Sequence, residues 1–115
     1  MKIKPIYVTF KQAKLLKKKG FDEECLYHYK KDGTRHLFIT DDEYESQAPE
    51  HWQVVEWLSV NHGIWISVKK NYDNGALLGF ESIVDISDGF IDCGTFNTPQ
   101  ETYSAAFNYV LTNLI

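Results

Sequence analysis

The sequence lacks most of the patterns on which common enzymes and metal sites depend. Its only two cysteines, Cys25 and Cys93, lie far apart and form no C-x-x-C pair, so neither a zinc site nor a redox dithiol is indicated. We expect both to be free thiols that serve as small buried hydrophobes, because disulfides are rare in the cytoplasm, where we place this chain.

Long apolar runs are also missing. The uncharged apolar segments are strand-sized, such as Ile64 to Val68, far below the ~20 residues that a membrane span needs. The first five residues begin with lysines but lack the apolar stretch and small-residue cleavage site of a secretory signal. We therefore expect a cytoplasmic protein with no membrane partner.

Catalytic and cofactor motifs are absent as well. The sequence has no Walker loop, no G-x-G-x-x-G and no G-x-S-x-G, and we expect no cofactor. His51 and His62 lie about 16 Å apart along one predicted helix. His28 and His36 fall on opposite faces of a predicted hairpin, so neither pair is expected to share a metal. An enzyme is the less favoured class.

Charge of both signs is present but unevenly divided. Residues 1–35 carry ten Lys/Arg and four Asp/Glu, a net of +6, whereas residues 36–115 carry two and twelve, a net of −10. Such a division could recognise an anion, dock on the acidic part of the same chain or pair head-to-tail with another copy. The single arginine, Arg35, and the net charge of −4 make duplex nucleic acid an unfavourable partner.

The hydrophobic pattern and the turn residues predict a single α+β domain over 1–115, an antiparallel sheet packed by three helices. Thr9 and Gln12 form a capping box before the first helix, and Asp32-Gly33 predicts a two-residue hairpin turn that places Tyr29 opposite His36. Beyond an acidic loop and a second helix we expect a three-stranded meander and a third helix. The expected helices are 10–19, 49–62 and 99–115; the expected later strands are 64–68, 80–86 and 90–96, with a flexible stretch over 69–75.

The second predicted helix carries apolar residues on two sides. Trp52, Val54, Val55 and Leu58 form a broad apolar arc, while Trp57 and Val60 lie opposite. Either its own domain covers this second pair, which we favour, or Trp57 and Val60 form a partner interface.

Two carboxylates, Asp85 and Asp92, form another candidate site. A turn at Asp88-Gly89 would place Asp85 directly opposite Asp92, and like charges there would call for a cation, a lysine or a raised pKa. We prefer a solvated face in a slightly different register.

The best-supported candidate site is an anion-binding surface on the first helix and hairpin. Lysines would supply charge, while aromatic residues and Arg35 would stack on or grip a planar, phosphorylated ligand such as a nucleotide. The alternative, which we favour, is that the tyrosines pack the hairpin and the lysines face solvent. The candidate residues are Lys14, Lys17, Lys18, Tyr27, Tyr29, Arg35 and His36.

Several caps and core positions form a recognisable set: Val8-Thr9-Phe10 with Ala13, Leu16 and Lys17 through Lys19-Gly20-Phe21, then Ala48-Pro49, Trp57-Leu58 and His62-Gly63, with Phe96 before the capped last helix. In these features the sequence resembles small uncharacterised proteins of Bacteroides-type phages and prophages. The resemblance implies a phage accessory protein in the host cytoplasm and carries no catalytic residue with it.

From these observations we expect a non-enzymatic accessory or counter-defence protein, forming a homo-oligomer, that binds a host protein or sequesters a nucleotide-like anion. The alternatives are a small enzyme acting on a nucleotide or cofactor through Asp85 and Asp92, and a minor virion component.

Overall fold

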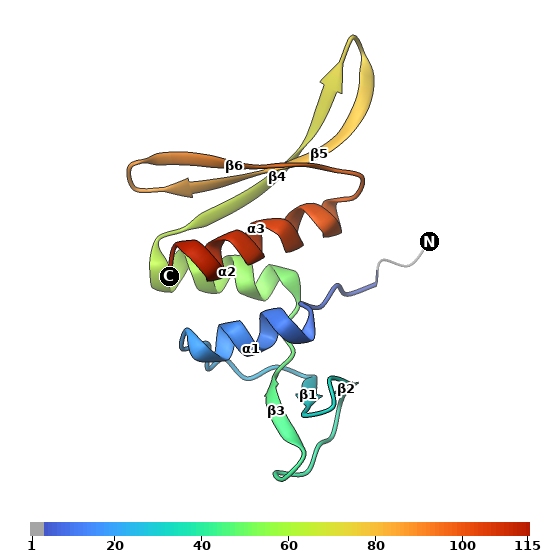
Figure 1. The fold of residues 1–115 in the computed structure, drawn as a ribbon, viewed down its shortest axis with the longest axis vertical. Coiled ribbons are helices and arrows are strands. Elements are labelled where there is room, and N and C mark those ends of the chain that lie inside the picture. Colours follow the sequence, from blue (N-terminus) through green and yellow to red (C-terminus); the bar gives the residue numbers. More distant parts are fainter. Residues whose placement is uncertain (1–3) are drawn as a thin grey trace. The chain divides into compact units, whose positions relative to one another are not determined.

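The computed structural model describes residues 4–115, and its fold is α+β, as predicted (Figure 1). The chain forms two compact units, an N-terminal unit up to Val54 and a C-terminal unit from Val55 to Ile115, and the division falls inside the second helix. Each unit has its own three-stranded antiparallel sheet, so the strands do not form the one sheet expected. That the whole chain is one domain stays a prediction. The first three residues, which contribute to the signal-peptide argument, lie outside the described residues.

The N-terminal unit opens on the predicted helix, α1, which spans Phe10–Lys18. Thr9 Oγ1 accepts from the Gln12 amide and Gln12 Oε1 accepts from the Thr9 amide, at 3.1 and 3.0 Å, so the capping box is confirmed. At the other end the amides of Gly20 and Phe21 donate back to the carbonyls of Lys17 and Leu16. This Schellman pattern satisfies carbonyls that the end of the helix would leave unpaired.

The sheet of the N-terminal unit has the order β2-β1-β3, with β1 at His28–Lys30, β2 at Arg35–His36 and β3 at Tyr44–Gln47. The predicted register of the hairpin is wrong by one position, since Tyr29 pairs with Arg35 and His28 with His36. The loop has three residues because Lys30 and Thr34 pair and Gly33 adopts a φ of 89°. This is the turn-plus-bulge loop that needs glycine in its last position.

Further predictions about this unit are corrected. The second strand, expected to continue through Leu37, Phe38 and Ile39, ends at His36. The acidic segment expected to be a loop contributes β3, which pairs with β1. Helix α2 spans His51–His62, beginning two residues later than expected, because the buried Pro49 uses its carbonyl to accept from the Val8 amide. Trp52, expected in the apolar arc, is 61% exposed.

The C-terminal unit contains the predicted meander, with longer strands than expected. Strands β4 (Trp65–Asp73), β5 (Ala76–Ile86) and β6 (Gly89–Phe96) lie in that order. The stretch 69–75 is not flexible loop, because β4 continues to Asp73 and the Asn74-Gly75 turn joins it directly to Ala76. Both turn residues have positive φ, as a type I′ hairpin requires. The β4–β5 hairpin extends beyond β6 as a two-stranded ribbon (Figure 1).

Helix α3 (Pro99–Asn113) packs against all three strands of this sheet and forms the core of the C-terminal unit. Thr98 Oγ1 caps it by accepting from the Glu101 amide at 3.1 Å. Thr102, Ala106, Phe107, Val110 and Leu111 are buried on the helix, and Ile66, Ser82 and Val84 are buried on the strands. Within residues 4–115, no helix combines the length and the apolar character that crossing a membrane requires.

Candidate functional site

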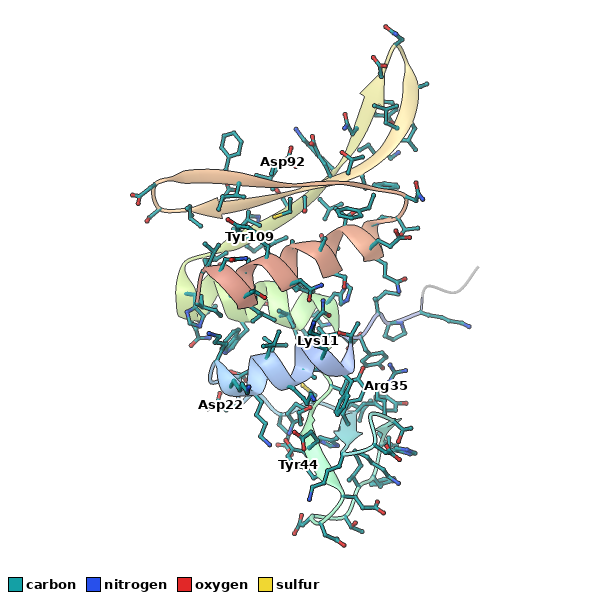
Figure 2. The ribbon with its side chains drawn as sticks, viewed as in Figure 1. Lys11, Asp22, Arg35, Tyr44, Asp92 and Tyr109 are labelled. Carbon is teal, nitrogen blue, oxygen red and sulfur yellow. The ribbon has the colours of Figure 1, made fainter. Side chains whose placement is uncertain are left out.

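Arg35 and two tyrosines form a compact cluster in the N-terminal unit. The guanidinium carbon of Arg35 lies 3.9 Å from the centroid of the Tyr7 ring and 5.7 Å from that of Tyr27. The two rings meet edge to face at 5.4 Å. A guanidinium stacked on an aromatic face keeps its N–H edge free to hold a carboxylate or phosphate in a bidentate manner. We call these three residues the Arg35 cluster; Figure 2 labels Arg35 beside the short sheet.

The local fold places each member of the cluster. Tyr7 forms an antiparallel bridge with Glu50, and the Tyr27 carbonyl accepts from the Ala48 amide at 3.0 Å. Arg35 begins β2 opposite Tyr29, and the three-residue loop sets this register. The cluster therefore depends on the hairpin register that sequence reasoning placed one residue away.

The Arg35 guanidinium has an open donor edge. Within residues 4–115 it makes contacts with the two rings and has no ion pair or hydrogen bond. Partial burial, Glu50 and Tyr27 raise the pKa of the Tyr7 hydroxyl, while Arg35 acts in the opposite direction. Tyr7 is therefore neutral at physiological pH, and the cluster contributes the single positive charge of Arg35.

Of the seven candidate residues, Tyr27 and Arg35 have side chains that meet in the Arg35 cluster. His36 Nε2 lies 2.9 Å from the Thr34 hydroxyl in the turn. Lys14 Nζ lies over the Phe10 ring at 4.7 Å, and Lys18 is exposed on α1. Lys17 Nζ donates to the Glu45 carbonyl at 2.6 Å and sits 5.6 Å from the Tyr44 ring, so its ammonium already has partners.

Tyr29 is unsuitable for ligand stacking, which corrects its place in the predicted site. It is 6% exposed, its hydroxyl donates to the Val8 carbonyl, and its ring lies 5.5 Å from that of Phe10. The tyrosine packs the unit, as the favoured structural interpretation has it.

His28 and His36 do not lie on opposite faces of the hairpin, so that prediction is wrong. The shifted register makes them cross-strand partners, so they occupy the same face of the sheet. Over residues 4–115, however, no group of three or more His, Cys, Asp or Glu side chains is placed to hold a metal ion.

Asp85 and Asp92 do not face each other. The turn uses Ser87 and Asp88, so Asp85 pairs with Phe90 and Ile83 with Asp92. Asp92 Oδ1 accepts from the Gly94 amide at 2.8 Å and so stabilises an irregularity in the β5–β6 pairing. The carboxylate pair offered for an enzyme is not formed, and the solvated face in another register is the correct alternative.

The two residues of the predicted partner interface differ in exposure. Trp57 is 6% exposed and its ring meets that of His62 edge to face at 4.9 Å, whereas Val60 is 77% exposed. Trp57 is unavailable to a partner, and Val60 by itself forms no apolar patch.

The net charges of the two units differ from those of the sequence segments 1–35 and 36–115. The N-terminal unit carries ten Lys/Arg and nine Asp/Glu, a net of +1, because the acidic segment 41–45 belongs to it. Glu43 pairs with Lys30 at 3.2 Å. The C-terminal unit carries two and seven, a net of −5. The broad basic surface is thus largely neutralised within its own unit.

Both cysteines are free, Cys25 buried and Cys93 half-buried. Burial, with help from Glu23 and other acids, raises the pKa of Cys25 to about 11. Burial also raises the pKa of Cys93. Neither thiol is activated as a nucleophile, since reactivity requires the thiolate.

Sequence reasoning missed Tyr7. It lies between Ile6 and Val8 in the extended segment before α1, where alternation puts its side chain opposite theirs. This alternation along the extended segment was the signal in the sequence that could have identified Tyr7.

No protein-family model, curated protein or solved structure matches this chain.

Proposed function

We propose that this protein acts by binding and that the Arg35 cluster holds the anionic group of a small planar ligand, of the nucleotide class. The observation that carries this proposal is the exposed guanidinium of Arg35, stacked at 3.9 Å on Tyr7 and without a hydrogen bond or ion pair inside residues 4–115. The stacked geometry pre-orients the donor edge, which reduces the entropy lost when an anion binds.

The aromatic rings suit the planar part of such a ligand. Tyr27 is half-buried and lies farther from the guanidinium than Tyr7, so part of its ring remains accessible beside the charge. A phosphate on Arg35 would then leave a base or other planar group near the tyrosine face, where stacking adds to the ionic contact.

The chemistry of the guanidinium favours a phosphate as the anionic group. A phosphate monoester is doubly charged and offers three acceptor oxygens, so it pairs with Arg35 more strongly than a single carboxylate does. Glu50, whose backbone is bridged to Tyr7, contributes to the raised pKa of that tyrosine.

The resemblance to small phage and prophage proteins supports an accessory or counter-defence role in the host cytoplasm, in which a bound signal is sequestered. Homo-oligomerisation remains part of this proposal. The alternative of a small enzyme loses its named residues, because Asp85 and Asp92 are not opposite each other.

Isothermal titration calorimetry with AMP, a cyclic dinucleotide and inorganic phosphate tests the proposal. We expect Arg35→Ala to abolish the heat of binding of the best probe. Arg35→Lys, which keeps the charge but loses the planar fork, should weaken binding about tenfold.

Lys18→Ala is the matched control, since it removes one exposed positive charge from the same unit and leaves the cluster intact. If Lys18→Ala and Arg35→Ala weaken binding equally, the net charge of the unit explains the effect, and the Arg35 cluster is not the binding site. No heat with any probe would overturn nucleotide-class binding.

A further inference from the structure

The sheet of the C-terminal unit is covered by α3 on one face and bears exposed aromatic residues on the other. Ile66, Ser82 and Val84 are buried on the helix side. Trp65 and Phe90, which have the opposite orientation in the strands, are 51% and 69% exposed. Figure 2 places Asp92 on the side of the sheet away from α3.

Three residues form one row across this outer face. Trp65 pairs with Asp85, and Asp85 pairs with Phe90, so the carboxylate lies between two aromatic side chains on neighbouring strands. Strands lie about 4.8 Å apart, which separates the two outer positions by roughly 10 Å. That spacing admits a flat cation above Asp85 with an aromatic ring on each side.

The charge of this face is unopposed at its centre. Within residues 4–115 the Asp85 carboxylate has no hydrogen bond or ion pair. Asp92 stands in the next row opposite Ile83 and uses one oxygen on the Gly94 amide. Glu81, one row further, is paired with Lys69 at 3.2 Å. The free negative charge therefore concentrates on Asp85 and Asp92, beside the two aromatic rings.

We propose that this outer face docks a basic segment of a partner protein, with an arginine side chain of the partner on Asp85 between Trp65 and Phe90. The arginine would gain a charge-assisted hydrogen bond to the carboxylate and cation–π contacts with the rings. Apolar residues next to it in the partner would cover the remaining aromatic surface and Ile83. Exposed aromatic residues around a polar centre are typical of binding surfaces.

Charge selects the kind of partner. With seven Asp/Glu and two lysines, the C-terminal unit repels nucleic acid and attracts cationic protein segments. A second copy of this chain is a poor source of the arginine, because its only one, Arg35, is stacked on its own Tyr7. The proposed partner is therefore a different protein. This docking surface shares no residue with the Arg35 cluster.

Fluorescence anisotropy with defined peptides tests the proposal. The probe is a labelled peptide of alternating arginine and leucine, and its counterpart replaces each arginine with citrulline, which keeps the shape and removes the charge. We expect the arginine peptide to bind at least about tenfold more tightly than the citrulline peptide, because only the cation pairs with Asp85.

Variants of the protein locate the binding. Asp85→Asn and Trp65→Ala should each weaken the arginine peptide about tenfold. Asp88→Asn removes the same charge from the adjacent turn, and Trp52→Ala removes an exposed tryptophan from α2; both should bind as the native protein does. Circular dichroism of each variant checks that it is folded. Arg35→Ala should leave peptide binding unchanged, which separates this proposal from the proposed function.

Three outcomes would overturn the docking surface. These are failure of the native protein to bind the arginine peptide, equal binding of the citrulline peptide, and equal effects of Asp85→Asn and Asp88→Asn. Sedimentation that shows a dimer dissociated by Trp65→Ala would assign the face to a second copy and overturn the choice of a foreign partner.

Discussion

The N-terminal unit is organised by single polar links, whereas the C-terminal unit is organised by a regular sheet under one long helix. The first has strands of two to four residues, and Tyr29, Gln47 and Lys17 each connect separate segments through a hydrogen bond to the backbone. The second has strands of eight to eleven residues and a helix of fifteen. The two units show that similar lengths of chain can be stabilised by different means.

The difference extends to charge and to the surfaces that each unit offers. The N-terminal unit is almost neutral and presents one unpaired guanidinium, while the C-terminal unit is acidic and presents two exposed aromatic rings around a carboxylate. An anion suits the first surface and a cationic segment the second.

The largest expected effect is in the core of the C-terminal unit. Phe107 is fully buried on α3, so Phe107→Ala should lower the free energy of unfolding by about 4 kcal/mol through lost burial and a cavity. Urea denaturation followed by circular dichroism measures it. A cost below that of Tyr29→Phe would contradict the view that this unit depends on its apolar core.

The next effect concerns Gly79 in β5, which lies close to the backbone of Phe96 in β6. Its φ is 154°, and an added Cβ would lie 2.4 Å from the Phe96 carbonyl oxygen, so Gly79→Ala must move backbone. We expect a loss of about 3 kcal/mol in the free energy of unfolding.

Gly75→Ala is the matched control in the same hairpin, because its φ is also positive but no atom lies within 4 Å of the added Cβ. That control should cost only about 1 kcal/mol. Equal costs for the two substitutions would mean that the close approach at Gly79 is unimportant.

The third effect is a dependence of stability on pH that arises in the N-terminal unit. Burial lowers the pKa of His51, in the N-terminal unit, from 6.5 to about 4. The unfolded chain therefore binds a proton more readily than the folded one, so the stabilising contribution is complete above pH 6.5 and is lost as pH falls toward 4. Partial solvent access reduces the expected loss to about 2 kcal/mol.

Urea denaturation at a series of pH values, compared with His51→Gln, measures this contribution. The variant should lose less stability than the native protein between pH 6.5 and 4. Parallel pH profiles for the two proteins would show that His51 does not titrate with folding.

The smallest effect concerns the hydroxyl of Tyr29. Tyr29→Phe removes the donor to the buried Val8 carbonyl and should cost about 1–2 kcal/mol in the free energy of unfolding. Tyr72→Phe, at an exposed position in the β4–β5 ribbon, should change stability negligibly. If the two substitutions cost the same, the polar links of the N-terminal unit are not what stabilises it.

Local patterns predicted the helices best. The capping box at Thr9 acts within one turn of the chain, and it is present. The register of the first hairpin was wrong, because its loop has three residues instead of two and the changed pairing continues along both strands, which brings His28 opposite His36. In the β5–β6 hairpin the two-residue turn lies one residue earlier than Asp88-Gly89, which separates Asp85 from Asp92 and agrees with the preferred alternative of another register.

The candidate sites were less predictable than the fold. Lys17 was expected to be available for a ligand, yet its ammonium is taken by the Glu45 carbonyl, 28 residues away in sequence. Tyr7 had no assigned role until the structure placed it beneath Arg35. Such contacts join segments that lie far apart in the sequence, and no periodic pattern in the sequence predicts them.

Composition, capping residues and hydrophobic period are local properties, and they were sufficient to establish an α+β chain with three helices and antiparallel hairpins. Tertiary structure alone decided which charges are neutralised, which aromatic residues are buried and which remain exposed. Trp57 and Trp65 illustrate this, since both are tryptophans on half-apolar elements, yet one is 6% and the other 51% exposed. The physical reason is that burial depends on what packs against an element, and no residue encodes its neighbours by itself.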